Sequence, residues 1–316
     1  MVTRNDFTEG LKKQAYSYFF ESYDFTPTIY TSIYREEPST AGYEQGTSVI
    51  GVGQLVEKPR NEPISYQKIQ EGWTTYGDNH TYARGVEFEM EMVDDHQRIS
   101  GLVQQAAKSW GEEVRRTKEV FYATAFNQGG KTAGHDFFKN PIAGQNAGGL
   151  LYDGKPLFNL ANNLRASKTG GTYFNSLALA FSLANLQTAW NLMVATNNRD
   201  ERDEIISLRP DVILYPPALK FTIETILETV TTGGANLEKN ILAGILKPIQ
   251  WDYLTDTDAW FILKTGFGLV AQNRQEPVID FYQDEDTKSY KMNVYCRFGA
   301  RFDNWRGVVA SQVSTS

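Results

Sequence analysis

The sequence predicts an α+β fold, in which helices and strands occupy separate stretches of the chain. Three observations carry this prediction. Apolar residues recur every three or four positions across residues 93–127, the spacing of an amphipathic helix. Apolar and acidic residues alternate across 86–91, the period of a half-buried strand. Two strand-like runs, 278–282 and 291–298, flank an acidic turn and indicate a hairpin near the C-terminus.

The first element is expected to be a helix over residues 6–23. Asp6 or Asn5 can cap it, because a short polar side chain accepts a backbone N–H bond at that position. Aromatic and aliphatic residues follow at helical spacing, and Pro27 marks the end of this region.

A long hairpin is expected over residues 42–91. Residues 47–57 are rich in Val, Ile and Gly, and the two prolines within 58–63 indicate a turn. A second turn is expected at residues 77–79, which read Gly-Asp-Asn. Few core segments flank this stretch, so the hairpin is expected to project and to leave strand edges that another subunit can cover.

The strongest helical pattern covers residues 93–127. A helix of about 30 residues extends about 45 Å at a rise of about 1.5 Å per residue, a length that suits a structural spine. The residues expected to face the core are Ile99, Val103, Trp110, Val114 and Phe121.

The second half of the chain alternates loops with short elements. Residues 128–174 are rich in Gly and Asn and predict a long loop. Residues 175–196 predict a helix, and Pro217 can begin another, because proline tolerates the first helical position. Further strands are expected at residues 212–215, 259–264 and 305–310.

The bulk composition excludes several classes of protein. The net charge of −7 argues against a protein that grips phosphates, because such binding needs clustered Lys and Arg. A single cysteine permits no internal disulfide, which fits a reducing compartment. No secretion signal is recognisable at the start, and no apolar run approaches the roughly 20 residues of a membrane helix.

Two motifs resemble functional sites but lack their full patterns. Residues 129–132 read Gly-Gly-Lys-Thr, yet Ala125 stands where a phosphate-binding loop needs its first glycine. That motif also requires a preceding strand, and a helix is expected here. No two of His80, His96 and His135 have the spacing of a zinc pair.

The remaining reactive groups also have structural interpretations. Cys296 alternates with Val294 and Phe298 on an expected strand, where cysteine behaves as a small apolar residue. Asp256 and Asp258 lack the glycine and the terminal glutamate of a calcium loop. We therefore predict no catalytic residue, no cofactor and no metal site, and a chain that is not an enzyme.

Three local sequences carry a family resemblance. They are Asp153-Gly154-Lys155-Pro156-Leu157-Phe158-Asn159, Pro210-Asp211-Val212-Ile213-Leu214-Tyr215-Pro216-Pro217-Ala218-Leu219 and Tyr253-Leu254-Thr255-Asp256-Thr257-Asp258-Ala259-Trp260. These sequences, and the order of the expected elements, resemble the major head (capsid) subunit of Mu-like tailed phages, which has the Hong Kong 97 type of capsid fold.

The resemblance implies a division of the chain into capsid domains. Residues 1–41 would be an N-terminal arm and 42–91 an extended loop that lies over a neighbouring subunit. Residues 92–174 would form the peripheral domain with its spine helix. Residues 175–265 would form the axial domain, and 266–316 would return to the peripheral domain as strands.

The resemblance also implies a major capsid protein of a tailed phage or prophage. Its copies would assemble as pentamers and hexamers into an icosahedral shell, in the cytoplasm of the host bacterium and without a membrane. The shell would enclose double-stranded DNA without sequence-specific binding. Its protein partners would be a separate scaffold protein, a portal and, in some shells, a decoration protein. The residues expected at contacts between subunits are Val49, Ile50, Val52, Leu55, Trp73 and Tyr76.

Flexing would allow one subunit to fit both kinds of ring. The glycines expected to act as hinges are Gly51, Gly53, Gly72 and Gly77. Two alternatives remain open at this point: an encapsulin-like nanocompartment shell protein, which shares the fold but encloses enzymes, and an enzyme of an unrelated α+β fold.

Overall fold

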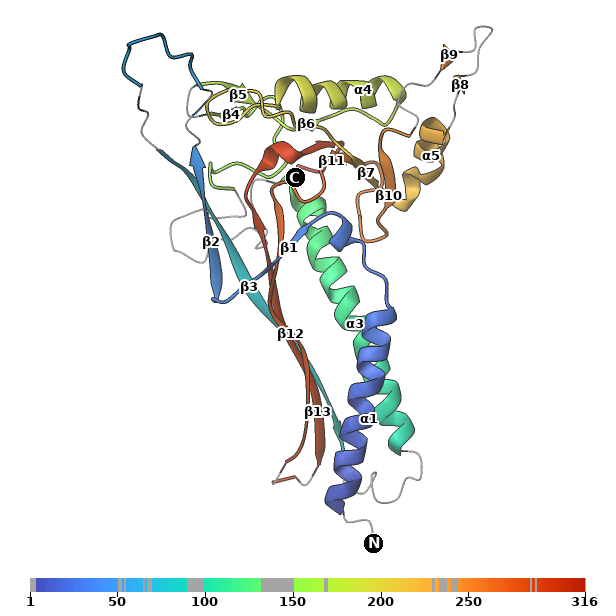
Figure 1. Ribbon diagram of the computed structural model, residues 1–316. Coiled ribbons are helices and arrows are strands. Elements are labelled where there is room, and N and C mark those ends of the chain that lie inside the picture. The colour runs from blue at the N-terminus through green and yellow to red at the C-terminus, as the bar shows by residue number, and fades with distance from the viewer. Residues whose placement is uncertain are drawn as a thin grey trace.

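The computed structural model shows an elongated molecule with a narrow stalk and a broader lobe at one end (Figure 1). Two long helices and three long strands run along the stalk, and the shorter helices and strands form the lobe. The described residues are 4–50, 53, 55–64, 66, 70–89, 99–131, 151–167, 170–228, 231–232, 238–239, 244–284, 286–287 and 289–315.

A five-stranded sheet with the order β1-β12-β13-β3-β2 supports the stalk. Strand β1 pairs parallel to β12, and the other pairs are antiparallel. The hairpin predicted near the C-terminus is confirmed and is longer than expected. The strands are β1 (Arg35–Pro38), β2 (Tyr43–Ile50), β3 (Gln70–Phe88), β12 (Leu269–Gln283) and β13 (Tyr290–Phe302).

Helices α1 (Arg4–Phe25) and α3 (Ile99–Gln128) lie side by side along the stalk. Gly111 of α3 allows this close approach, because a Cβ there would lie 2.7 Å from the carbonyl oxygen of Phe19. The ring of Phe121 contacts the ring of Phe298 on β13, which ties α3 to the sheet. Buried residues of α3 include Val103, Trp110, Val114 and Phe121. The side chain of Ile99 lies outside the described part.

A second five-stranded sheet, with the order β10-β7-β11-β14-β6, forms the centre of the lobe. Its central strands separate two hydrophobic clusters. Alternate residues such as Leu214 and Phe261 belong to the larger cluster, which continues into the stalk around α1, α3 and the stalk sheet. Ile213 and Ile262 belong to the other cluster, which lies within the lobe. The strands are β6 (Ser176–Leu177), β7 (Val212–Tyr215), β10 (Lys247–Gln250), β11 (Trp260–Leu263) and β14 (Val308–Ser311).

Shorter elements complete the lobe and its connections. Helix α4 (Leu183–Asn191) continues into a π-helical turn, η2 (Leu192–Thr196). A 3₁₀ turn, η3 (Pro217–Leu219), leads into α5 (Lys220–Glu228), so Pro217 does stand at a helix start. The remaining elements are η1 (Tyr30–Ser32), β4 (Arg165–Ala166), β5 (Thr172–Tyr173), β8 (Thr231–Thr232), β9 (Glu238–Lys239) and η4 (Trp305–Gly307).

The turn predicted at residues 77–79 is wrong, because β3 runs through it without a break. Asp78 pairs with Tyr43 on one side, and Asn79 pairs with Gly299 on the other. A Cβ at Gly77 would lie 2.7 Å from the carbonyl oxygen of Ala300, so the glycine serves close packing between strands. It is therefore not the hinge expected from the sequence. Long-range pairing overrides the local turn preference.

The helix predicted over residues 175–196 is wrong in its first third. Asn175 is fully buried, and its Nδ2 donates to the carbonyl oxygens of Leu157 (2.9 Å) and Val308 (3.1 Å). The chain then forms β6, and α4 begins only after Ser182, whose hydroxyl accepts from the backbone N–H of Asn185. Hydrogen bonds from a buried amide to distant strands leave no periodic signal in the sequence.

The last strand of the segment 266–316, which was expected to return to the peripheral domain, joins the sheet of the lobe. Strand β14 pairs with β11 and β6 in the lobe sheet. Its four residues are all buried, as expected for a strand covered on both faces. The strand predicted over 305–310 thus divides into the turn η4 and β14.

Candidate assembly surfaces

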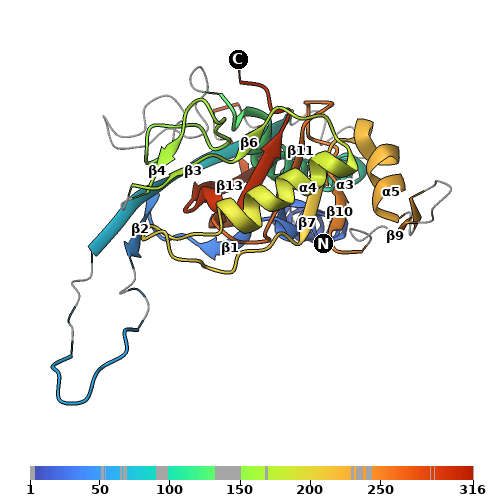
Figure 2. The ribbon, with the colours of Figure 1, turned by 90° about the horizontal axis from the view of Figure 1, so that it is seen from above.

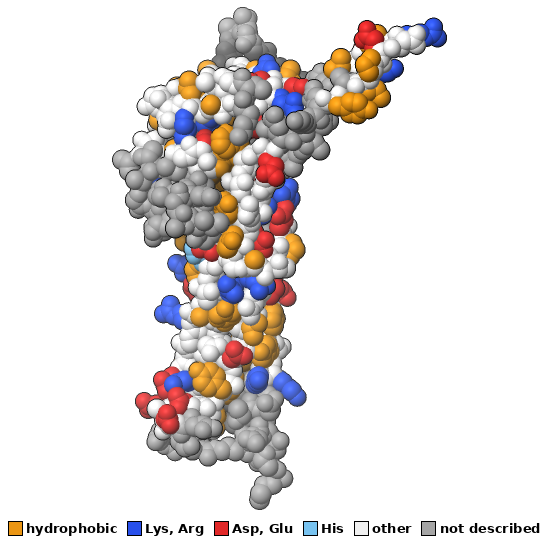
Figure 3. All heavy atoms as spheres, turned by 90° about the vertical axis from the view of Figure 1, so that its left-hand side faces the viewer, with side chains coloured by type: hydrophobic (Ala, Val, Ile, Leu, Met, Phe, Trp, Pro, Cys, Tyr) orange, Lys and Arg blue, Asp and Glu red, His pale blue; other side chains and the backbone are white. Residues whose placement is uncertain are grey.

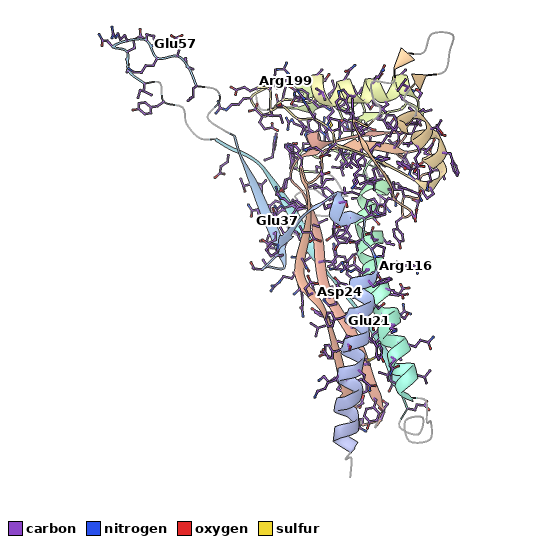
Figure 4. All side chains as sticks on the ribbon, turned by 45° about the vertical axis from the view of Figure 1, so that its right-hand side comes forward. Glu21, Asp24, Glu37, Glu57, Arg116 and Arg199 are labelled. Carbon is purple, nitrogen blue, oxygen red and sulfur yellow. The ribbon has the colours of Figure 1, made fainter. Side chains whose placement is uncertain are left out.

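The most exposed apolar residues lie on the hairpin that β2 and β3 form. The two strands pair from Tyr43 with Asp78 to Ile50 with Gln70, and the chain beyond them stands away from the body (Figure 2). In Figure 4, Glu57 marks the outer end of this hairpin. The hairpin tip, by which we mean the described residues within 53–66, carries four exposed apolar side chains. They are Leu55 (98% exposed), Val56 (74%), Ile64 (61%) and Tyr66 (90%).

Side chains this exposed and apolar on one projecting segment are typical of a surface that meets another protein. Leu55 was expected at a subunit contact. Tyr76, on β3, is half-buried. Val49 and Ile50 belong to β2, but their side chains lie outside the described part, as does the whole of Val52.

Trp73 was also expected to contact a neighbour, but its side chain makes contacts within the chain. Its ring stacks on Tyr152 at 5.0 Å between centroids and an interplanar angle of 22°. Its Nε1 donates to Oε2 of Glu201 at 3.3 Å. The other oxygen of Glu201 accepts from Nη1 of Arg306 at 2.7 Å. These residues hold the base of the hairpin against the lobe.

The same group extends into the core of the lobe. Nε1 of Trp305 donates to the hydroxyl of Tyr152 at 3.1 Å, and the guanidinium of Arg306 lies 4.7 Å from the Trp305 ring centroid. Burial raises the pKa of Tyr152 to about 12, so its hydroxyl stays neutral. We call Trp73, Tyr152, Glu201, Trp305 and Arg306 the root cluster. Sequence reasoning missed this cluster, because its members come from four separate segments.

A second set of polar contacts supports the base of the hairpin from the stalk side. Thr75 Oγ1 donates to Oδ1 of Asp303 at 2.9 Å. Arg301 binds the same carboxylate through Nε at 2.6 Å and reaches Glu37 on β1 through Nη2 at 3.0 Å. The base of the hairpin is thus fixed to β1 and to the end of β13.

A buried carboxylate joins the arm to the rest of the molecule. Glu119 of α3 accepts from the backbone N–H groups of Ile29 and Tyr30, in the segment that follows α1. It also accepts from Nε1 of Trp251 at 2.6 Å, just after β10. Burial raises the pKa of Glu119, although these three donors oppose the shift. One side chain therefore fixes three segments.

The lobe presents a second group of exposed apolar side chains. Phe221, on α5, is 80% exposed, and Ile205, in the loop between η2 and β7, is 67% exposed. The two residues come from different parts of the lobe, because the loop that carries Ile205 contacts the base of the hairpin through Glu201, whereas Phe221 belongs to α5. Apolar side chains this exposed are typical of surfaces that meet another protein.

Positively and negatively charged side chains are interspersed on the surface of the stalk. Lys and Arg alternate with Asp and Glu on the described part of the face shown in Figure 3. This distribution offers no basic patch there for a nucleic acid backbone.

The reactive side chains considered from the sequence lie in structural positions. Cys296 is buried on β13, and burial raises the pKa of its thiol to about 11, which disfavours the reactive thiolate at neutral pH. A hollow of about 540 Å³ between β3, α3 and β13 reaches this residue. His80 lies on β3 rather than in a turn, with its ring 5.7 Å from that of Phe121. His96 and His135 lie outside the described residues.

The other two motifs are turns. Residues 129–131 form the exit of α3, where the N–H of Lys131 donates to the carbonyl oxygen of Gln128. Asp256 accepts from the backbone N–H of Ser314, and burial together with the neighbouring Asp258 carboxylate, which accepts a hydrogen bond from the protonated Asp256, raises the pKa of Asp256. Among the described residues, no group of three or more His, Cys, Asp or Glu side chains is placed to hold a metal ion. Nor does any described helix combine the length and apolar character needed to cross a membrane.

Solved structures of viral shells share this architecture. The chain superposes on a mature capsid subunit of bacteriophage PhiM1 with a TM-score of 0.55 at 10% identity, over 92% of this chain and 89% of that one. The capsid of cyanophage P-SCSP1u gives 0.54 at 11% identity, over 92% and 89%. A virus-like particle from Pyrococcus furiosus gives 0.51 at 11% identity, over 95% and 98%. The predicted Hong Kong 97 type of fold is confirmed.

Sequence comparison distinguishes between the classes of protein that remained open, namely a phage capsid, a nanocompartment shell and an enzyme. No curated protein matches the chain significantly. The family model described as phage capsid protein matches residues 74–311, which include most of β3, the strands β12 and β13, the spine helix and the lobe. This match favours a phage capsid over a nanocompartment shell and over an enzyme. The chain therefore belongs to the phage capsid protein family and is a structural protein of the bacteriophage head.

Proposed function

We propose that this subunit builds an icosahedral head as pentamers and hexamers, with the hairpin as its main contact to the next copy in the ring. The observation that carries the proposal is the exposure of Leu55 (98%) and Tyr66 (90%) on a segment that projects from the body. A head-to-tail contact of this kind closes into rings when the rotation between neighbours permits. Each contact can be weak, since every subunit makes several at once.

We further propose that the stalk and the lobe correspond to the domains that the resemblance implies. We assign the arm to residues 1–41, the extended loop to 42–91 and the peripheral domain, with the spine helix α3, to 92–174. The axial domain takes 175–265 together with β14, because β14 completes the lobe sheet. In this assignment, Phe221 lies on the surface that meets other copies at the ring centre. Val49, Ile50, Val52 and Tyr76 remain proposed contacts of the extended loop.

The finer placement among phages and the partners are also proposals. The three local sequences at 152–159, 210–219 and 253–263 support a Mu-like head subunit. We propose a separate scaffold protein and a portal as partners, with assembly in the host cytoplasm. The shell would enclose double-stranded DNA without sequence-specific contacts. The net charge of −7 supports this, because an acidic subunit does not hold incoming DNA tightly.

The test replaces the apolar tip without touching the folded body. In the variant L55S/Y66S, two side chains that contact little of their own chain become polar, so folding should be unaffected. The matched control is F25S, because Phe25 is 89% exposed but lies at the end of α1. Electron microscopy and light scattering should show rings or closed shells for the wild type and F25S, and unassembled subunits for L55S/Y66S. Normal assembly of L55S/Y66S would contradict the proposal.

A further inference from the structure

The hairpin has a base that is bound to the rest of the molecule and an outer segment beyond the paired strands. At its base, Trp73 and Thr75 are bound to the lobe and to the end of β13. Pairing between β2 and β3 ends at Ile50 and Gln70, and the register shifts between Thr47 and Val49. Such a shift bends the strand that carries it. The base of the hairpin is therefore mechanically tied to the lobe, and a force on the outer segment reaches the lobe through these contacts.

Glu201 stands where the base of the hairpin meets the lobe. Its side chain is 14% exposed and that of Arg306 is 3% exposed, so water does not replace their ion pair readily. The partner on the hairpin side is Trp73, through its Nε1. Glu201 thus links a residue of β3 to a residue of η4, and the backbone of Glu201 itself belongs to a loop of the lobe.

That loop, residues 198–206, is held by its own hydrogen bonds and by Asp203, whose carboxylate accepts from the hydroxyls of Ser167 and Tyr173. The N–H of Asp200 donates to the carbonyl oxygen of Glu204 at 2.9 Å, and the N–H of Ile206 donates to that of Asn198 at 3.2 Å. The carboxylate of Asp200 accepts from the N–H groups of Arg202 (2.7 Å) and Glu204 (2.9 Å). The loop also carries the exposed Ile205. In Figure 4, Arg199 marks this loop on the side of the lobe from which the hairpin leaves.

We propose that Glu201 is a positioning residue that couples the hairpin to the 198–206 loop, so that a pull on the hairpin by a neighbouring copy alters the surface around Ile205. The coupling acts through a continuous series of contacts, from the Trp73 ring to Glu201 and from Glu201 to Arg306. A coupling free energy is reciprocal, so loosening either end must loosen the other. The property belongs to the single folded chain, and its test does not depend on shell assembly.

Hydrogen exchange followed by mass spectrometry on the full-length, unassembled subunit tests this coupling. In the variant W73A, amides of residues 200–206 should exchange faster by about 5- to 150-fold, the range of a typical coupling between sites. The matched control is Y76A, which removes an aromatic ring from the same strand but touches no residue of the loop in the described contacts. In Y76A the loop should exchange at the wild-type rate.

Conservative variants at both ends of the contact distinguish a loss of coupling from general misfolding. E201Q retains an amide oxygen for Trp73 but loses the charge that pairs with Arg306, and W73F retains an aromatic ring but loses the N–H donor. E201Q should speed exchange in residues 71–76 of β3, and W73F should give a smaller change in the loop than W73A. Wild-type exchange in the loop of W73A, or an equal change in W73A and Y76A, would overturn the proposal.

Discussion

Replacing Glu119 with glutamine tests how far a single buried acceptor holds the arm to the spine helix. The carboxylate receives three N–H groups from two distant segments, through one oxygen from Ile29 and Tyr30 and through the other from Trp251. Glutamine keeps the size of the side chain but has one oxygen and one NH₂ group. Whichever way the amide is turned, at least one of these donors faces another donor.

The loss of stability expected for this substitution follows from the burial of Glu119 and its partners. Trp251 is fully buried and Glu119 is 4% exposed, so water does not reach an orphaned N–H group there. A buried donor without an acceptor costs about 1–3 kcal/mol. We therefore expect E119Q to lower the free energy of unfolding by about 1–3 kcal/mol. E119A orphans all three donors and should cost at least about 3 kcal/mol.

Equilibrium urea unfolding at pH 7 and a fixed protein concentration measures this, with tryptophan fluorescence as the signal. The control is E113Q on the same helix. Glu113 has a side chain that is 55% exposed and pairs with Arg116 on the helix surface, so E113Q should remain within about 0.5 kcal/mol of the wild type. If E119Q unfolds at the same urea concentration as E113Q, the carboxylate does not fix the arm and the reasoning fails.

Two further predictions concern the base of the hairpin. G77A should lower the free energy of unfolding by about 1–3 kcal/mol, because the new Cβ would lie 2.6 Å from Oε1 of Gln272. The control is G85A on the same strand, where a Cβ would meet no atom under 3.4 Å. G85A should leave the thermal unfolding unchanged. Hydrogen bonds from Ser39 and from the N–H of Thr40 lower the pKa of Glu44 below its ordinary 4.5. A lowered carboxyl pKa stabilises the fold above the unfolded-state value and loses that effect as pH falls through the native value. The wild type should therefore lose thermal stability relative to E44Q between pH 6 and pH 3.5, and a constant difference would contradict this.

Periodic patterns predicted the elements that are stabilised along their own length. The spine helix follows from its apolar spacing, and α3 buries Val103, Trp110, Val114 and Phe121 on the expected face. Strands β7 and β11 were placed correctly, because short runs of Val, Ile, Leu and Phe suit strands buried on both faces. In each case the residues that define the element are neighbours in the sequence.

The predictions that were wrong concern residues whose partners lie far away in the sequence. At residues 77–79, turn-forming residues lie in a strand because partners on β2 and β13 pair with them. At Asn175, a buried amide bonds to strands far along the chain and displaces the expected helix start. Trp73 lies 128 positions from Glu201, which lies 105 positions from Arg306. No spacing rule connects residues that only the folded chain brings together.

The position of the hinge follows from this arrangement of contacts. A subunit that serves both five- and six-membered rings must vary the angle at which it meets its neighbour. Gly77 cannot supply this freedom, because β3 is packed on both sides at that point. Gly53, in contrast, lies beyond the paired strands and has a φ of 77°, a conformation that glycine adopts without strain. We therefore expect the ring angle to be absorbed beyond the register shift at Thr47 and Val49, while the base keeps its contacts with the lobe.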